Sequence, residues 1–341
     1  MGVRRPSWTA AGVGALLAAL LSAGVPARPQ AADTAASARL PTKRLYSERS
    51  PFNRRIPARP RLDRDSARMI AGLGRSVLEG GATLAWRQYT VPLFMASRNT
   101  PRRRVRLTAS WRPRRALAGV PLPRNAAPDP SEDGHLAVID RSTGCEYDFW
   151  RFRRRGRRWQ ASWGNAISAR GSGIYPRGYS ARGSGFALMA GVVLPAELER
   201  GRIDHALLLS YPYTRARGPV RPATESDGRT RGRGAIPEGA RLQLDPSVDL
   251  DALGLSGYER TIARALQVYG AYVGDTAGRG VTLYAVHPTS TRRNPYGSII
   301  PDEEYPSLDG IPFESMRVLR LGERHRGRPR IRTDGCARFV R

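Results

Sequence analysis

Two carboxylates and a tryptophan alternate along residues 145–150, Cys-Glu-Tyr-Asp-Phe-Trp. Side chains two apart on a β-strand point to the same face, so Glu146 and Asp148 would stand about 7 Å apart. One carboxyl kept protonated by its neighbour's charge can serve as an acid, while the other serves as a base or nucleophile. An indole ring such as that of Trp150 can stack on a sugar ring. These residue types at this spacing therefore predict glycosidic chemistry.

The strand that would carry these residues is half of a predicted β-hairpin. Two alternating runs, 135–140 and 145–150, flank a four-residue turn that ends in Gly144. Pairing Asp140 with Cys145 predicts a core face made of Leu136, Val138, Cys145, Tyr147 and Phe149. The opposite face then holds His135, Ala137, Ile139, Glu146, Asp148 and Trp150. We expect this second face to stay outside the core and to line one wall of a glycan cleft through its imidazole, carboxylates and indole.

The candidate site draws on residues beyond this hairpin. The candidates for catalysis are His135, Glu146, Asp148, Glu197 and His205, and the candidates for substrate binding are Trp150, Trp163 and Arg154. A lyase would use a histidine or tyrosine as its base and arginine to neutralise a uronate carboxylate. The alternative is that Glu146 and Asp148 lie on an exposed sheet face, paired with arginines such as Arg154.

The run from Glu146 to Trp150 resembles the Glu-x-Asp-x-Glu motif on the concave strand of the concanavalin-A-like sandwich glycosidases. In that family the motif supplies the nucleophile, a helper aspartate and the acid/base. The resemblance implies a β-sandwich, with the nucleophile at Glu146 and the helper at Asp148. Trp150 stands where the family has its second glutamate, so this run has no counterpart of the family's acid/base.

A wider resemblance, from about residue 134 to residue 288, is to a group of secreted proteins of soil actinobacteria. It rests on Trp163-Gly164, Glu197, Gly201-Arg202-Ile203-Asp204-His205, and Ala265-Leu266 through Asp275. This resemblance implies an exported, β-rich domain and assigns no activity.

Two functions of different classes fit these observations. The first is a carbohydrate-active enzyme, either a glycoside hydrolase or a polysaccharide lyase, that acts on an extracellular polysaccharide. The second is a noncatalytic cell-envelope or polysaccharide-binding β-sandwich protein, whose tryptophans and arginines hold a glycan. Catalysis requires the side chains to converge in a cleft, whereas a binding face can be flat.

No residue pattern in the sequence predicts a metal or another cofactor. The four histidines, His135, His205, His287 and His325, include no pair at zinc-ligand spacing, and the chain has only two cysteines. In an exported chain, those two cysteines, Cys145 and Cys336, predict a disulfide that fastens the C-terminal tail to the hairpin.

The chain is strongly basic, with 57 Lys and Arg against 29 Asp and Glu and a net charge of +28. Lys43 is the only lysine, and the guanidinium groups of arginine bind carboxylates, sulfates and phosphates through paired hydrogen bonds. An anionic polysaccharide or cell-envelope glycan is therefore a candidate partner, although a GC-rich coding bias would also produce this excess. Zinc-finger spacing, aromatic RNA-binding signatures and basic heptad helices are absent, which disfavours a specific nucleic-acid partner.

Residues 1–32 have the pattern of an export signal. Arg4 and Arg5 precede an uncharged run from Ala10 to Val25, and small residues at 27–32 offer cleavage sites. The alternative is an uncleaved membrane anchor, but the run is short and diluted with Ala and Gly. We expect a protein that is secreted or held at the cell surface, with no membrane span after cleavage.

The elements expected to position the site make a mainly β protein. Residues 33–60 read as a linker or extended arm, 61–120 as an N-terminal helix with strands, and 121–341 as the main body. A capping box at Ser256 and Glu259 begins a helix that ends at Gly270, with an apolar face made by Tyr258, Ile262, Leu266 and Tyr269. The expected fold is an antiparallel β-sandwich, jelly-roll or concanavalin-A-like, with this one amphipathic helix packed against it.

Overall fold

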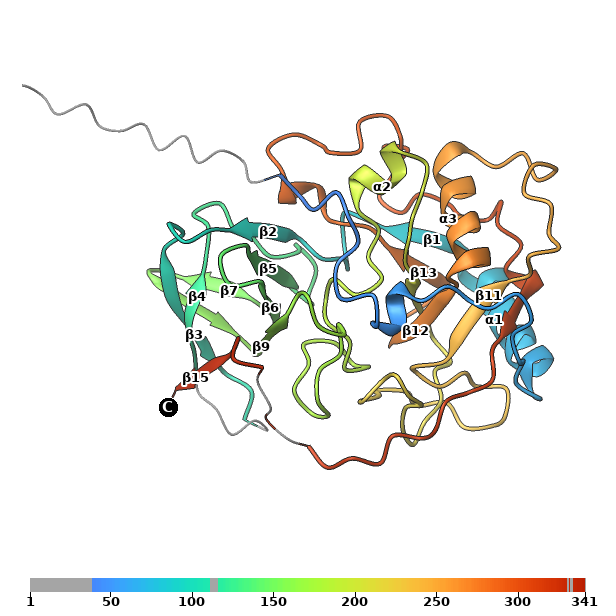
Figure 1. The fold of residues 1–341 in the computed structure, drawn as a ribbon, viewed down its shortest axis with the longest axis horizontal. Coiled ribbons are helices and arrows are strands. Elements are labelled where there is room, and N and C mark those ends of the chain that lie inside the picture. Colours follow the sequence, from blue (N-terminus) through green and yellow to red (C-terminus); the bar gives the residue numbers. More distant parts are fainter. Residues whose placement is uncertain (1–38, 111–115, 330, 332–333, 341) are drawn as a thin grey trace, which may run out of the picture. The chain divides into compact units, whose positions relative to one another are not determined.

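A computed structural model of the protein describes residues 39–110, 116–329, 331 and 334–340 (Figure 1). The expected export signal, residues 1–32, lies outside the described residues. The fold is mainly β, as expected, and its strands form sheets of six, five and four strands. Among the described residues, no helix is both long enough and apolar enough to span a membrane.

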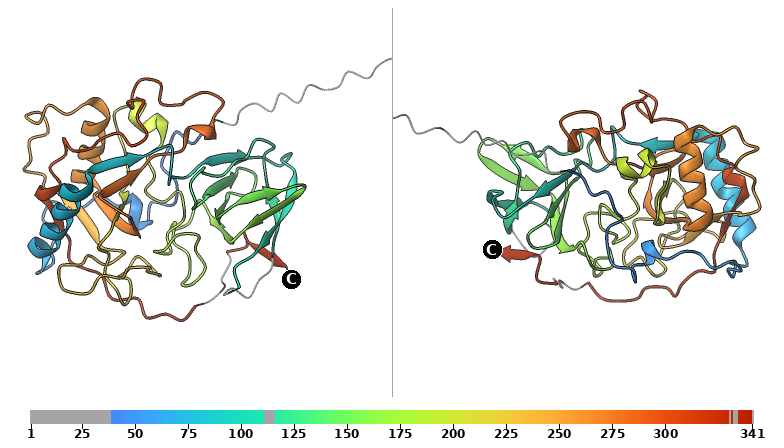
Figure 2. Two further views of the ribbon diagram at one scale, coloured as in Figure 1. Left: turned by 180° about the vertical axis from the view of Figure 1, so that it is seen from behind. Right: turned by 45° about the horizontal axis from the view of Figure 1, so that its top comes forward.

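The six-stranded sheet has the strand order β1-β13-β10-β12-β11-β14. Its strands are β1 (Ala82–Ala85), β10 (Leu207–Tyr211), β11 (Arg241–Leu244), β12 (Ala271–Thr276), β13 (Val281–Tyr284) and β14 (Met316–Val318). One face packs against the apolar side chains of α1 (Ser66–Gly80) and α3 (Gly257–Val268). Figures 1 and 2 show both helices on the side of this sheet that faces away from the four-stranded sheet.

Helix α3 confirms the prediction of an amphipathic helix that begins after Ser256. The Ser256 and Glu259 side chains form the predicted capping box, and the predicted apolar face is buried. Helix α1 also forms within the region expected to contain a helix, and its Met69, Ile70 and Leu73 are buried.

Leu266→Ala is expected to lower the free energy of unfolding by about 2–5 kcal/mol, because it leaves a cavity between α3 and the sheet. Arg264 lies on the exposed side of the same helix. Arg264→Ala, measured in the same denaturant titration, is expected to cost less than about 0.5 kcal/mol. Equal losses for the two variants would contradict the assignment of the buried face.

The four-stranded sheet contains the predicted hairpin, in the strand order β2-β5-β6-β9. Its strands are β2 (Leu93–Ala96), β5 (Leu136–Asp140), β6 (Cys145–Trp150) and β9 (Trp163–Ser168). Asp140 pairs with Cys145 and Ala137 with Asp148, which confirms the predicted register. Strand β6 ends at Trp150, where Arg151 adopts a positive φ of 53°.

The five-stranded sheet has the order β15-β4-β3-β8-β7 and lies over the predicted core face of the hairpin. Its strands are β3 (Arg102–Leu107), β4 (Ala116–Pro121), β7 (Arg153–Arg155), β8 (Arg158–Ala161) and β15 (Arg338–Val340). The predicted disulfide is confirmed: Cys145 in β6 bonds to Cys336, two residues before β15. The C-terminal strand β15 pairs within the five-stranded sheet, and the disulfide joins the segment just before it to the four-stranded sheet.

The antiparallel jelly-roll sandwich is not confirmed, because all three sheets are mixed. Strand β1 pairs in parallel with β13, β2 with β5, and β3 with β8. The strands expected in an N-terminal part, residues 61–120, therefore contribute to each of the three sheets. Residues 39–60 contain only one short 3₁₀ helix, η1 (Pro51–Asn53), whose Phe52 is buried against Phe186 and Tyr272.

Candidate functional site

A pocket of about 440 Å³ opens where the hairpin of the four-stranded sheet meets the end of β12. We call it the carboxylate pocket. Its lining residues are Asp133, His135, Trp150, Ser180, Ala181, Arg182, Gly183, Glu225, Ser226, Asp227, Asp275 and Thr276. Two of the predicted site residues, His135 and Trp150, lie in its wall.

Asp275, near the end of β12, is the carboxylate best placed for proton transfer. Its side chain is 23% exposed, and its Oδ2 atom lies 3.3 Å from Nη1 of Arg182. Burial, followed by the nearby charges of Asp227 and Asp133, raises the pKa of Asp275 to about 7, against the opposing effect of Arg182. A carboxyl group with this pKa can hold or release a proton near neutral pH.

A hydrogen bond and a cation–π contact hold the Arg182 side chain in place, so its charge stays beside Asp275. Its side chain is 1% exposed, its Nη2 donates to the carbonyl oxygen of Leu188 at 3.1 Å, and its guanidinium lies 5.3 Å from the centre of the Tyr284 ring. A buried arginine without a carboxylate would be costly, so Arg182 and Asp275 depend on each other.

Two further carboxylates lie beside Asp275. Nearest oxygens of Asp227, Glu238 and Asp275 lie within 4.8 Å of one another. Asp227 is exposed and accepts from Thr276 Oγ1, whereas Glu238 is fully buried and accepts from the backbone N–H of Asp227. Burial and the charges of Asp227 and Asp275 raise the pKa of Glu238 well above its usual value, which favours its protonated form. The same three groups have the spacing and the oxygen ligands that a divalent cation such as Ca²⁺ accepts.

The other wall of the carboxylate pocket combines an indole and an imidazole. Trp150 Nε1 donates to Asp133 Oδ1 at 3.0 Å, and the guanidinium of Arg151 lies over the indole ring at 4.5 Å. Burial lowers the pKa of His135 to about 4, although the charge of Asp133 opposes the change. His135 is therefore neutral and weakly basic at pH 7.

Glu146 and Asp148 share a face with His135 and Trp150, as predicted, but this part of the face is fully buried. Residues 175–189 cover it, and two backbone N–H groups and two tyrosine hydroxyls donate hydrogen bonds to the carboxylates. Asp148 Oδ2 accepts from Leu188 N and Tyr175 Oη, at 2.9 and 3.0 Å. Glu146 accepts from Met189 N and Tyr46 Oη, at 3.1 and 2.7 Å. The expectation that this whole face stays outside the core is wrong for these two residues, which do not line the carboxylate pocket.

Burial of both carboxylates also changes their ionisation. Burial raises the pKa of Asp148 to about 6 and that of Glu146 well above its usual value. Between about pH 4 and pH 6 the folded protein therefore binds more protons at Asp148 than the unfolded chain does, so this group's contribution to stability falls as the pH rises.

Asp148→Asn is expected to be less destabilising at pH 7.5 than at pH 4.5, by roughly 1–3 kcal/mol, because asparagine does not ionise. The measurement is the free energy of unfolding of variant and wild type at both pH values. Asp302→Asn, at an exposed carboxylate, serves as the control. A difference between variant and wild type that is the same at both pH values would contradict the raised pKa of Asp148.

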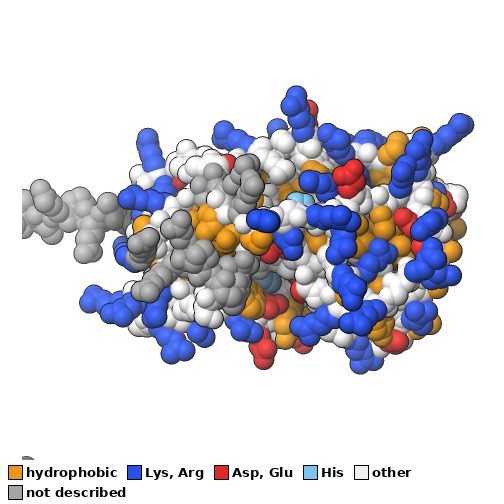
Figure 3. All heavy atoms as spheres, turned by 90° about the horizontal axis from the view of Figure 1, so that it is seen from below, with side chains coloured by type: hydrophobic (Ala, Val, Ile, Leu, Met, Phe, Trp, Pro, Cys, Tyr) orange, Lys and Arg blue, Asp and Glu red, His pale blue; other side chains and the backbone are white. Residues whose placement is uncertain are grey.

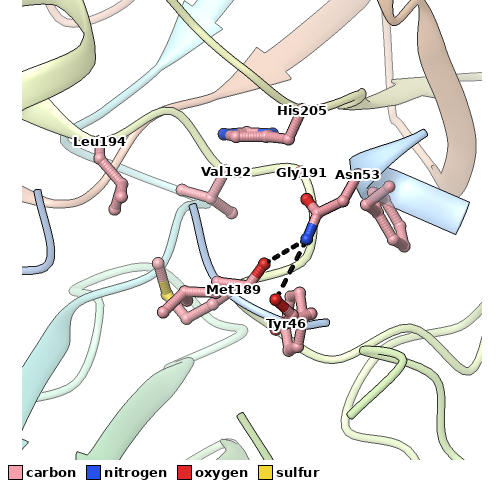
Figure 4. A pocket seen from close by; sticks show the side chains of 9 residues that line it. Tyr46, Asn53, Met189, Gly191, Val192, Leu194 and His205 are labelled. Carbon is pink, nitrogen blue, oxygen red and sulfur yellow. Dashed lines mark hydrogen bonds between the residues drawn. The ribbon is translucent and has the colours of Figure 1, made fainter. Parts of the chain in front are cut away.

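Glu197 and His205 come together, but away from the carboxylate pocket. His205 Nε2 lies 3.1 Å from Glu197 Oε2, and both residues are buried. Figure 4 shows His205 above the segment from Met189 to Leu194, beside a cavity of only about 10 Å³. That space holds at most a single water molecule, so a sugar ring cannot enter it.

The remaining two candidates for substrate binding also lie outside the carboxylate pocket. Trp163, in β9, is fully buried, and its ring stacks on that of Phe339 at 5.7 Å. Arg154, in β7, is exposed, donates to the carbonyl oxygen of Gly156 and lies over the ring of Trp159.

The comparisons with known proteins give no family. Neither family models, nor curated proteins, nor solved structures match the chain.

Sequence reasoning missed most of the polar lining of the carboxylate pocket. Arg182 lies in the second copy of the repeated Ser-Ala-Arg-Gly-Ser-Gly segment, residues 180–185, and Asp227 and Glu238 lie in an Arg- and Gly-rich loop region. The only available signal was a buried-looking strand, 271–276, that ends in Asp-Thr, because polar groups at strand ends often face a site.

Proposed function

We propose that the protein is a glycoside hydrolase that acts on an extracellular polysaccharide in the carboxylate pocket. The observation that carries this proposal is the pairing of Asp275 with Asp227, two carboxylates within 4.8 Å of each other in a pocket that also presents Trp150. Most glycoside hydrolases use such a pair of carboxyl groups, and an aromatic ring beside the pair can stack on the sugar. The pKa of Asp275, about 7, supports its role as the proton donor.

In the proposed reaction, Asp275 donates its proton to the glycosidic oxygen as that oxygen leaves the anomeric carbon. Asp227 attacks the same carbon and forms a covalent glycosyl ester. The ionised Asp275 then takes a proton from a water molecule, which displaces Asp227 and releases the sugar. The short separation of the two carboxylates favours this double displacement, since inverting enzymes keep theirs about 6.5–9.5 Å apart to admit a water.

The low basicity of His135 favours hydrolysis over the lyase alternative. A lyase needs a base that removes a proton from a carbon beside a carboxylate. The imidazole of His135 is 6% exposed and has a pKa of about 4, so it is a weak base for that step. Export from the cell is part of this proposal, and it is supported by the signal-like N-terminus and by the disulfide.

The proposal is tested by incubating the protein with a panel of neutral and acidic polysaccharides from plants and bacteria. The expected result is new reducing ends, no ultraviolet absorption from unsaturated sugars, and a first product that keeps the anomeric configuration by NMR. Activity is expected to persist in EDTA. Unsaturated products would indicate a lyase. Loss of activity in EDTA would indicate that Asp227, Glu238 and Asp275 bind a cation. Binding of a polysaccharide without cleavage, across the whole panel, would indicate a binding module.

A further inference from the structure

A second pocket, of about 650 Å³, adjoins the carboxylate pocket and has the opposite charge. We call it the arginine pocket. Its lining residues are Arg177, Arg217, Gly218, Pro219, Glu225, Ser226, Arg324, His325 and Arg326. Glu225 is the one carboxylate in this lining, against four guanidinium groups. Glu225 and Ser226 line both pockets, so the two share a wall.

The arginine pocket is assembled from segments far apart in the sequence. The segment after β14 runs back along residues 219–221: Arg324 forms an antiparallel bridge with Val220, and His325 N donates to the carbonyl oxygen of Pro219 at 3.0 Å. Arg177 donates to the carbonyl oxygen of Gly327. In Figure 1 this segment runs along the bottom of the view, and Figure 3 shows many basic side chains, in blue, on the face seen from below.

The backbone at this pocket adopts an uncommon conformation at Arg217. Arg217 has a φ of 68°, in the left-handed region that residues other than glycine rarely occupy. Gly218 follows with a φ of 108°, and a Cβ atom there would lie 3.2 Å from Nε of Arg324. Such strain is found most often where it holds a functional group in place.

His325 adds an unsatisfied polar atom to the same wall. Its Nδ1 is buried and has no hydrogen-bond partner among the described residues. Partial burial and the positive charges of Arg221 and Arg177 lower the pKa of His325, so the ring is neutral at pH 7. The ring therefore adds no charge of its own to a pocket whose cations are guanidinium groups.

We propose that the arginine pocket is a subsite for an anionic sugar residue, next to the residue cleaved in the carboxylate pocket. Guanidinium groups bind carboxylate and sulfate oxygens through paired, charge-assisted hydrogen bonds. The shared wall at Glu225 and Ser226 allows one chain to extend from one pocket into the other. The substrate class is therefore an acidic polysaccharide, and this inference rests on the proposed function.

The test measures binding by isothermal titration calorimetry, separately from turnover. The probes are a linear polyuronate, the same polymer after carboxyl reduction, a sulfated polysaccharide and its desulfated form. Wild type is expected to bind at least one acidic polymer at least tenfold more tightly than its neutral counterpart. Arg217→Gln with Arg326→Gln is expected to remove that preference and to leave binding of the neutral polymer unchanged. The carboxylate and sulfate arms identify which anion is recognised.

The matched control is Arg98→Gln with Arg103→Gln, which removes the same charge from two exposed arginines that line neither pocket. If this control loses the preference equally, net charge and not the arginine pocket attracts the polymer, and the inference is wrong. Equal affinity for acidic and neutral glycans, or tighter binding of duplex DNA through the same two arginines, would also overturn it. Selective binding through these arginines without cleavage would instead refute the hydrolase and retain the anion subsite.

Discussion

Asp275→Asn is expected to lower kcat on the best polysaccharide about 10²- to 10⁴-fold and to change KM little. Asparagine has nearly the same shape as aspartate but cannot protonate the glycosidic oxygen. Its amide oxygen can still accept from Arg182, which Leu188 also holds in place. The substrate should therefore still bind, and only the proton transfer should be lost. Initial rates of reducing-end release over a range of polymer concentrations measure both constants.

The informative comparison is with Asp148→Asn, because the sequence alone predicts that Asp148 is catalytic. Asp148 is fully buried, and its carboxylate is occupied by Leu188 and Tyr175. We expect this variant, once folded, to keep kcat within about tenfold of wild type. If Asp148→Asn loses more turnover than Asp275→Asn, the catalytic carboxylates are those of the hairpin and not those of the carboxylate pocket.

The pH dependence of kcat/KM gives an independent check on the same assignment. Asp275 must carry its proton to act as the acid, and its pKa is about 7. Activity should therefore fall as the pH rises above about 7, and this limb should be absent from the residual rate of Asp275→Asn. A wild-type rate that stays level up to pH 9 would contradict the role of Asp275.

The parts of the fold that could be predicted are those that depend on residues close to one another in the sequence. The register of the hairpin follows from strict alternation around a turn that ends in Gly144. The start of α3 follows from Ser256 and Glu259, three residues apart. In both cases the interacting residues are close in the sequence, so the periodicity alone determines which side chains share a face.

The parts that could not be predicted depend on contacts between distant segments. The alternation of apolar and polar residues shows which side chains share a face of a strand, but it does not show which segment covers that face. The segment that buries Glu146 and Asp148 begins near Tyr175. Likewise, Arg182, Asp227 and Asp275 come from three separate segments and meet only in the folded chain. The parallel pairs that exclude a purely antiparallel sandwich also join distant strands, such as β1 and β13.

Replacing Cys145 and Cys336 together by alanine is expected to lower the free energy of unfolding by about 5 kcal/mol. The disulfide joins residues that are 191 positions apart, and in the chain-entropy account a loop of this length strongly restricts the unfolded chain. The measurement is the midpoint of denaturant unfolding, compared with that of the oxidised wild type. A variant with an unchanged midpoint would contradict this contribution.

The same variant separates stability from the proposed chemistry. Neither cysteine lines the carboxylate pocket, so the folded variant should keep the wild-type kcat below its unfolding transition. Beyond Cys336, β15 still pairs with β4, and Phe339 still stacks on Trp163, which would hold the tail in place without the covalent bond. A thiol titration of the denatured, unreduced wild type should find no free thiol. Two free thiols would show that the bond does not form, and the expected loss of stability would then have no cause.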